Sequence, residues 1–214
     1  MKKVFCIILV ALLVFGSAAC GKSEEPDLPG VTEYSATEVN GEYSVLISPM
    51  PKKIDDIYDH IDTDDPVNVS AYFMAGLVRA AESESDGFEI MDYLCASKSP
   101  FEDSITEGMP EKETHKAWLK EVERNYIPRS YYQGATPENG YTPDEPWTIS
   151  FKINEAQTTD YNSTAANGYE YIVYDIQSSG RDTTRQLVLF KRPGDTRWYM
   201  NSFSGILTQI QAPK

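Results

Sequence analysis

The chain has 214 residues, of which 41% are hydrophobic and 12% aromatic, and these values indicate a globular protein rather than a disordered one. This length allows one domain with a core that needs neither disulfides nor a metal. The net charge of −14 at pH 7 repels phosphate backbones and therefore argues against a nucleic-acid partner.

The first 20 residues have the pattern of an export signal. Two lysines precede an apolar run over residues 4–15, which is too short to cross a bilayer core of about 30 Å. Small residues at 16–19 and then Cys20 resemble a bacterial lipoprotein signal, in which this cysteine is diacylated and becomes the new N-terminus. The resemblance implies that residues 1–19 are removed and that acylated Cys20 anchors the protein in the cell membrane, facing outside the cytoplasm. Ser17 stands where such signals prefer Leu, so release as a secreted protein is the alternative.

The three cysteines of the chain do not allow an internal disulfide in the exported protein. Cys6 lies in the leader, Cys20 is the expected lipidation site, and Cys95 is then the only thiol left. We interpret Cys95 as a thiol packed in the core. A nucleophile paired with His60 or His115 is the alternative.

A flexible tether is expected over residues 20–30, because this segment combines acidic residues, Ser, Gly and Pro. A single α+β domain is expected over residues 31–214. Its first element is a β-hairpin over residues 31–47, predicted by Asn40-Gly41 between two strand-like segments. Both turn residues tolerate positive φ, which a two-residue hairpin requires.

The apolar spacing after the hairpin predicts a short helix over residues 54–61, whose other face carries aspartates. Acidic residues are dense between Asp55 and Asp65, which raises the hypothesis of a calcium site. The segment lacks the central Gly and terminal Glu of an EF-hand loop. We therefore interpret it as a solvated face with Asp65 as a helix cap, and calcium remains the alternative.

Further helices are predicted before residue 125, giving three to four in all. Asp65-Pro66 begins the clearest one, which runs to about Ala81 with apolar residues at helical spacing. A second helix is expected over residues 86–96 and a third from Pro110 to Arg124.

Residues 127–147, which we call the hinge, separate the helical half from the strand half. The hinge is rich in Pro, Gly and aromatic residues, so we expect no regular structure in it. Aromatic rings beside polar groups suit a sugar ring or a peptide. The candidate binding residues are therefore Arg129, Tyr131, Tyr132, Asn139, Tyr141 and Trp147. The alternative is that the rings hold a long connection onto the domain.

Apolar and polar residues alternate after the hinge, which predicts strands. The expected strands are residues 147–153, 169–176, 185–192 and 198–203, joined as an antiparallel meander. Residues 206–210 extend the sheet or pack across its end. Several strand positions are apolar on both faces, so we expect a curved sheet with helices on its concave side.

Two resemblances follow from these residues. Helices followed by a curved antiparallel sheet resemble the cone-shaped nuclear transport factor 2-like fold, in which an enzyme would place an Asp–His or Asp–Tyr pair inside the cone. Asp175 beside Tyr174 is the only such strand pair, and we expect Asp175 to face solvent or an edge.

Residues 126–147, 72–75 and 90–94 are similar to the signature of an uncharacterised domain family. That family occurs in lipoproteins of Gram-positive, clostridia-like bacteria, and the likeness covers about residues 65–214 without implying an activity.

The sequence contains no phosphate-binding Gly-rich loop, nucleophile elbow or His-Glu-x-x-His motif. We therefore predict no catalytic residue, no cofactor and no metal ligand. We expect a membrane-anchored extracytoplasmic lipoprotein that acts as a non-catalytic binding or scaffold module for a cell-envelope glycan, peptide or partner protein. The alternative is an enzyme or small-ligand-binding protein with a pocket on the concave face of the sheet.

Overall fold

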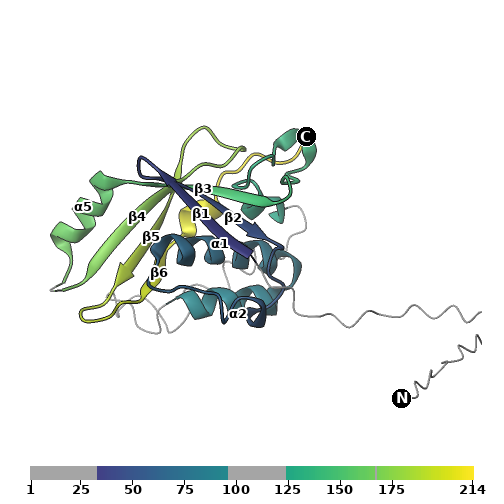
Figure 1. Ribbon diagram of the computed structural model, residues 1–214. Coiled ribbons are helices and arrows are strands. Elements are labelled where there is room, and N and C mark those ends of the chain that lie inside the picture. The colour runs from purple at the N-terminus through teal and green to yellow at the C-terminus, as the bar shows by residue number, and fades with distance from the viewer. Residues whose placement is uncertain (1–32, 96–123, 167) are drawn as a thin grey trace, which may run out of the picture.

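The computed structural model describes residues 33–95, 124–166 and 168–214, which form an α+β domain. Six strands make one antiparallel sheet in which every strand pairs with its neighbours in sequence (Figure 1). They are β1 (Glu33–Val39), β2 (Glu42–Ser48), β3 (Trp147–Ile153), β4 (Glu170–Ile176), β5 (Arg185–Lys191) and β6 (Trp198–Ser202). The predicted fold class, the N-terminal hairpin and the antiparallel meander are confirmed.

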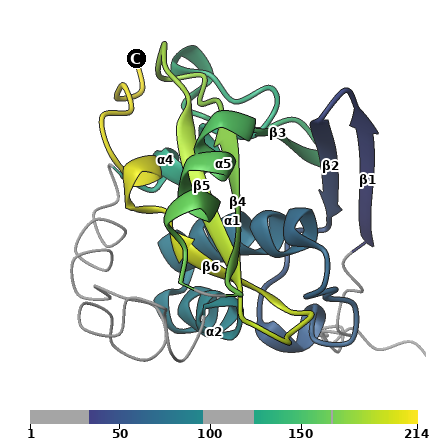
Figure 2. The ribbon, with the colours of Figure 1, turned by 90° about the vertical axis from the view of Figure 1, so that its left-hand side faces the viewer.

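Helices lie on both sides of this sheet. Two long helices, α1 and α2, cover one face, and α5 lies against the opposite face (Figure 2). We call the face that carries α5 the outer face. The helices are α1 (Pro66–Glu82), α2 (Glu84–Leu94), α4 (Tyr126–Arg129) and α5 (Glu155–Thr164), with 3-10 turns η1 (Ile54–Asp56), η3 (Pro137–Asn139) and η4 (Ser204–Leu207).

Helix α1 begins where the sequence predicts. The Asp65 carboxylate accepts a hydrogen bond from the Val67 N–H at 2.9 Å, and Pro66 occupies the first turn, where no N–H is needed. Apart from Arg79, every residue from Val67 to Ala80 is buried, because α1 packs against both the sheet and α2. Gly87 of α2 allows this close approach, since a Cβ there would lie 2.1 Å from the Ala80 nitrogen.

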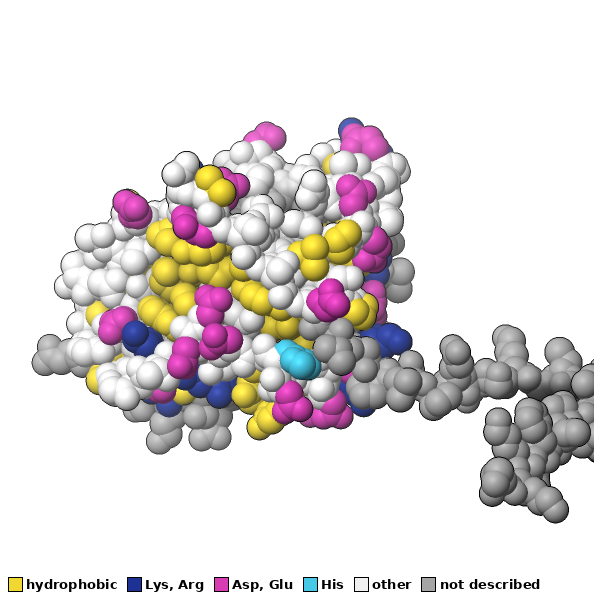
Figure 3. Space-filling model, in the orientation of Figure 1, with side chains coloured by type: hydrophobic (Ala, Val, Ile, Leu, Met, Phe, Trp, Pro, Cys, Tyr) yellow, Lys and Arg dark blue, Asp and Glu magenta, His cyan; other side chains and the backbone are white. Residues whose placement is uncertain are grey.

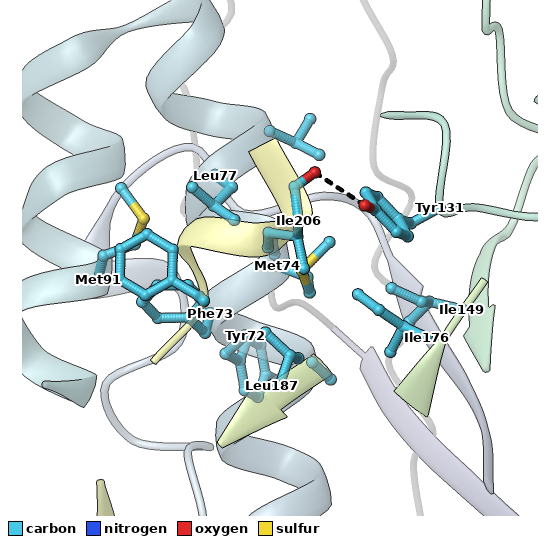
Figure 4. Close-up of a cluster of buried hydrophobic side chains, with 14 of the residues drawn as sticks. Tyr72, Phe73, Met74, Leu77, Met91, Tyr131, Ile149, Ile176, Leu187 and Ile206 are labelled. Atoms are coloured by element: carbon cyan, nitrogen blue, oxygen red, sulfur yellow. Dashed lines mark hydrogen bonds between the residues drawn. The ribbon is translucent and has the colours of Figure 1, made fainter. Parts of the chain in front are cut away.

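The main core lies between the sheet and α1 (Figure 4). Phe73 of α1 contacts Phe203, with ring centroids 4.6 Å apart. A smaller cluster lies on the outer face and consists of Tyr171, Val173, Val188 and Phe190. Tyr161 of α5 covers it, with its ring 5.4 Å from that of Tyr171. Strands β4 and β5 are therefore apolar on both faces because each face is covered.

Some predicted elements differ in the structure. The helix expected over residues 54–61 is the single turn η1, because the Asp56 carboxylate accepts the N–H groups of Lys52 (2.8 Å) and Lys53 (3.2 Å) and closes a local turn. Helix α5 was not predicted. Of the two alternatives for residues 206–210, the structure shows packing rather than extension of the sheet, since the apolar side chains of η4 lie in the core. The helix expected from Pro110 lies outside the described residues except for its last residue.

The hinge is less irregular than its composition indicates. It contains the last residues of the one-turn helix α4 and the 3-10 turn η3, and Tyr132 makes an isolated antiparallel bridge to Ile149 of β3. None of the helices in the described part of the chain combines the length and the apolar character that a membrane crossing requires.

Candidate functional site

The sheet divides between β3 and β4. These strands pair only through Lys152 with Asp175 and Ile153 with Tyr174, whereas β4 and β5 pair along seven residues. Beyond the pair of Lys152 and Asp175 the two strands diverge, and we call this opening the fork. A diverging antiparallel pair leaves backbone groups that must bond elsewhere.

Residues 130–135 of the hinge fill the fork. The Gln133 N–H donates to the Thr148 carbonyl at 2.8 Å, on the β3 side. The Ser179 N–H donates to the Ser130 carbonyl at 3.0 Å, on the side that follows β4. The hinge thus takes the place that a continuous β3–β4 ladder would occupy.

Buried serines fix this segment in position. Ser130 and Ser178 are each 1% exposed, and the Ser178 hydroxyl donates to Ser130 Oγ at 2.8 Å. Ser130 Oγ in turn donates to the Ile127 carbonyl at 2.7 Å, and Ser178 Oγ accepts from the Gly180 N–H at 3.0 Å. Because these hydroxyls are satisfied inside the protein, they hold the segment without needing a ligand.

A depression of about 690 Å³ lies at the fork, and we call it the fork depression. Its lining combines hinge residues with residues of β2, β3, β4 and the β4–β5 loop, most of which are polar. They are Glu42, Ser130, Tyr131, Tyr132, Gln133, Gly134, Ala135, Thr136, Thr148, Ser150, Phe151, Lys152, Asp175, Gln177, Ser179 and Thr184. Phe151 belongs to the main core together with Ile149 and Tyr174. The other strand residues of the lining alternate with these core residues, so the depression opens on the outer face.

Three charged residues form a row at one end of the fork depression. Strand register places Lys152 between Glu42 of β2 and Asp175 of β4. Both Asp175 oxygens accept from the Asn154 amide, at 3.2 and 3.0 Å, and one also accepts from Gln186 at 3.2 Å. Among the described residues, no carboxylate lies within ion-pairing distance of the Lys152 ammonium, which is exposed. Lys152 is therefore a cation that can pair with a ligand.

Two of the six candidate binding residues line the fork depression, and their rings lie mostly beneath it. Tyr131 is 4% exposed, and its hydroxyl donates to the Ile206 carbonyl at 2.8 Å (Figure 4). Tyr132 is 2% exposed and packs edge-on against Trp147 at 5.1 Å, and its buried hydroxyl has no partner. Burial raises the pKa of both phenols, so they stay neutral.

The other four candidates lie away from the depression and make contacts within the protein. Tyr141 is 0% exposed and donates from its hydroxyl to the Gln211 carbonyl at 2.8 Å. Arg129 forms an ion pair with Glu82 at 2.8 Å, and the Trp147 indole N–H donates to the Glu145 carboxylate.

The Asn139 side chain closes its own turn. Its oxygen accepts from the N–H groups of Thr136 (2.9 Å) and Thr142 (3.1 Å), and its amide donates to the Gly134 carbonyl at 2.8 Å. For Asn139 and Tyr141 the structure thus shows the role that the sequence offered as the alternative, which is to hold a long connection in place. Ligand contact by the six residues stays a prediction.

The remaining polar candidates of the sequence have local roles or lie outside the described residues. Asp56 and Asp65 accept backbone N–H groups, and in the described ranges no three His, Cys, Asp or Glu side chains group as a metal site would require. Cys95 is buried, and within the described part of the chain it forms no disulfide. Cys20 and His115 lie outside the part of the chain that the structure describes.

Comparison with known proteins gives a family but no activity. The chain belongs to the family described as a domain of unknown function (DUF6935), which matches residues 50–214. The match begins at residue 50 rather than near residue 65, and the β1–β2 hairpin lies outside it. Neither a curated protein nor a solved structure matches the chain.

Proposed function

We propose that this protein is a non-catalytic binding module of the cell envelope that holds a hydroxyl- and amide-rich glycan in the fork depression. The observation that supports this is the lining, in which Ser, Thr and Gln side chains surround about 690 Å³ on the outer face of the sheet. Hydroxyl groups both donate and accept, and a primary amide does the same, so such a lining can pair with the hydroxyl and acetamido groups of a sugar. The volume lies within the range of about 300–1,000 Å³ that is usual for small-molecule sites.

The rigidity of the site also supports the proposal. The floor is fixed by the hydrogen bond between Ser130 and Ser178 and by the Tyr131 bond to Ile206, so it is formed before a ligand arrives. A preformed site loses little conformational entropy on binding, which improves affinity for a polar ligand.

The row of charged residues at one end of the fork depression would orient a bound ligand. Lys152 can donate to a carboxylate or a carbonyl of the ligand, while the exposed Glu42 carboxylate can accept from hydroxyl or amide groups. A glycan that carries acetamido groups, and an acidic substituent at one end, has the chemistry that this row can recognise.

The proposal includes attachment to the membrane through acylated Cys20, facing outside the cytoplasm. Two acyl chains contribute about 0.8 kcal/mol per buried CH₂, which is enough for stable anchoring without a transmembrane helix. Mass spectrometry of the N-terminal peptide from the membrane fraction tests this. A diacylated peptide that begins at Cys20 is expected, and the Cys20→Ala variant should lack it. An unmodified peptide from secreted protein would contradict the anchor.

Binding is tested by titrating the full chain, in mild detergent, with a soluble β-1,4-linked oligomer of N-acetylglucosamine. Ser150→Tyr fills the depression, and Thr37→Tyr is its control, because Thr37 is exposed on the same face two strands away. We expect the first variant to weaken binding by at least about tenfold and the second to leave it unchanged. Equal binding by the wild type and Ser150→Tyr would exclude the depression as the site.

A second titration separates the ligand classes. A short peptide of the cell-wall stem type replaces the oligosaccharide under the same conditions. Binding of the peptide alone, blocked by Ser150→Tyr, would overturn the glycan assignment while keeping the site. Absence of binding to either ligand at millimolar concentration would overturn the proposal.

A further inference from the structure

The two edges of the sheet differ in how they are protected. Strand β6 is only five residues long, and its register with β5 shifts at Val188 and Leu189. On its other side, the backbone of Cys95 forms an isolated parallel β-bridge with Met200. The Trp198 N–H also donates to the Thr63 carbonyl at 2.8 Å. Strand β1 has seven residues, an unshifted register with β2, and no strand of the described residues on its other side (Figure 2). Within the described part of the chain, β1 is therefore the edge strand with an open ladder edge.

The hairpin turn determines which groups of β1 face outward. Asn40 and Gly41 have φ values of 55° and 77°, as in a two-residue hairpin loop, so Val39 and Glu42 exchange hydrogen bonds. Alternation along the ladder then directs the backbone groups of residues 33, 35, 37 and 39 toward β2. The N–H and C=O groups of Tyr34, Ala36 and Glu38 therefore point away from the sheet. If the backbone groups of Glu42 point toward β1, those of its neighbour Gly41 must point toward β3. The Ile153 N–H does donate to the Gly41 carbonyl, at 3.0 Å, which agrees with this alternation.

We propose that β1 pairs with β1 of a second copy, in antiparallel orientation about a two-fold axis through Ala36. Ala36 then lies opposite Ala36 of the second copy, and Tyr34 lies opposite Glu38 at both ends. The three outward residues of each chain supply six hydrogen bonds, because each of the three facing pairs exchanges two. The two sheets become one continuous sheet across the axis.

The side chains of β1 are self-complementary in this register. Ala36, the smallest side chain of the strand, lies at the axis, where facing Cβ atoms are about 5.5 Å apart. Glu38 faces Tyr34 and Glu33 faces Val39, so no carboxylate faces another. Val39 is 67% exposed in the single chain, and the methylene groups of Glu33 cover it in the pair. An unrelated extended peptide would share the backbone bonds but not this match of charge and size.

The pair is expected to be weak and to depend on salt in a particular direction. Two seven-residue strands form an interface below the size of about 1,200 Å² that stable complexes bury, so dissociation in the micromolar range is expected. Each chain carries a net charge of −14, and acidic side chains are spread over the face that Figure 3 shows. Salt screens the mutual repulsion of two chains with a Debye length of about 10 Å at 0.1 M. Dimerisation should therefore strengthen as salt is added. This proposal does not depend on a ligand in the fork depression.

Analytical ultracentrifugation of the full chain in mild detergent, over a range of protein concentrations, tests the pairing. The wild type is expected to dimerise, and Ala36→Glu and Ala36→Lys should each weaken the dimer by at least about tenfold, because each places like charges on the axis. An equimolar mixture of these two variants should restore the dimer. Ser35→Glu is the control for charge, because it adds a carboxylate that faces Thr37.

Three results would overturn the proposal. The wild type could remain monomeric at every protein and salt concentration. Ala36→Glu could dimerise as strongly as Ser35→Glu, which would show that another surface is used. The mixture of Ala36→Glu with Ala36→Lys could remain monomeric although both variants keep the circular dichroism spectrum and melting temperature of the wild type. Folding should be retained, because Ala36 is exposed and its N–H points away from β2.

Discussion

Replacing Tyr141 measures how far the hinge contributes to stability. The ring is 0% exposed, it stacks on Tyr126 with centroids 5.3 Å apart, and the hydroxyl bonds to the Gln211 carbonyl at 2.8 Å. Truncating a buried aromatic side chain to Ala costs about 3–5 kcal/mol, because burial is lost and a cavity is left. Removing the hydroxyl alone costs about 0.5–1.5 kcal/mol. Tyr141→Ala should therefore be several times more destabilising than Tyr141→Phe.

Urea denaturation followed by circular dichroism provides the assay. For a chain of this size, the loss in Tyr141→Ala corresponds to a fall in melting temperature of about 6–20 °C. Tyr58→Ala is the matched control, since Tyr58 is 57% exposed and contacts Tyr93 at 5.3 Å. The control should lose no more than about 1.5 kcal/mol. If Tyr141→Ala lost less than Tyr58→Ala, the hinge would not be part of the folded core, and our interpretation of its aromatic residues would be refuted.

Three further predictions concern packing and titration. Tyr132→Phe should leave the free energy of unfolding unchanged or raise it by up to about 1 kcal/mol, because the buried hydroxyl has no partner, and a clear loss in urea denaturation would contradict this. Gly87→Ala should destabilise by at least about 1–3 kcal/mol, because the new Cβ would meet the Ala80 backbone. Gly205→Ala, whose nearest neighbour would be 3.9 Å away, should be tolerated in the same assay. Burial raises the pKa of Tyr72 from 10.0 to about 12, so the unfolded state loses its proton first and stability should fall as the pH rises from 10 through 12. Tyr72→Phe should move the alkaline unfolding midpoint, followed by circular dichroism, to higher pH.

Local signals in the sequence predict most of the elements. Asp65-Pro66 predicts the start of α1, because a cap acceptor and a residue without an N–H meet the needs of a first helical turn. Asn40-Gly41 predicts the β1–β2 turn, because both residues adopt positive φ there. Strand β3 has the predicted limits, since its polar and apolar side chains alternate between a solvated face and a buried one.

Helix α5 has no comparable signal. None of its residues is buried, so its sequence carries no apolar stripe at a period of 3.6. The local evidence is Asn154, whose side chain accepts from the Gln157 N–H at 3.0 Å as a helix cap. Composition alone favours a polar loop there. Contacts with β4 hold the segment in place: the Tyr161 ring packs on Tyr171, and the Tyr171 and Val173 N–H groups donate to the side chains of Asn162 (2.8 Å) and Thr158 (3.0 Å).

The fork depression could not be predicted from any single segment. Alternation identifies Ser150 and Lys152 as outward-facing residues of β3, but it does not show which outward residues lie beside a depression. That depends on the short pairing of β3 with β4 and on the insertion of residues 130–135 between them. Both are relations between segments far apart in the sequence.

The aromatic residues of the hinge mark the site without forming most of its surface. Tyr131 and Tyr132 place their rings in the core at the fork, and this keeps residues 130–135 between β3 and the chain that follows β4. The opening leaves polar side chains of both strands facing the same depression, so the aromatic residues create its shape and Ser, Thr, Gln and Lys side chains supply its chemistry. A change such as Ser150→Tyr should therefore affect binding at constant stability. Truncation of Tyr131 should affect both together, because the ligand contacts cannot persist when their support is removed.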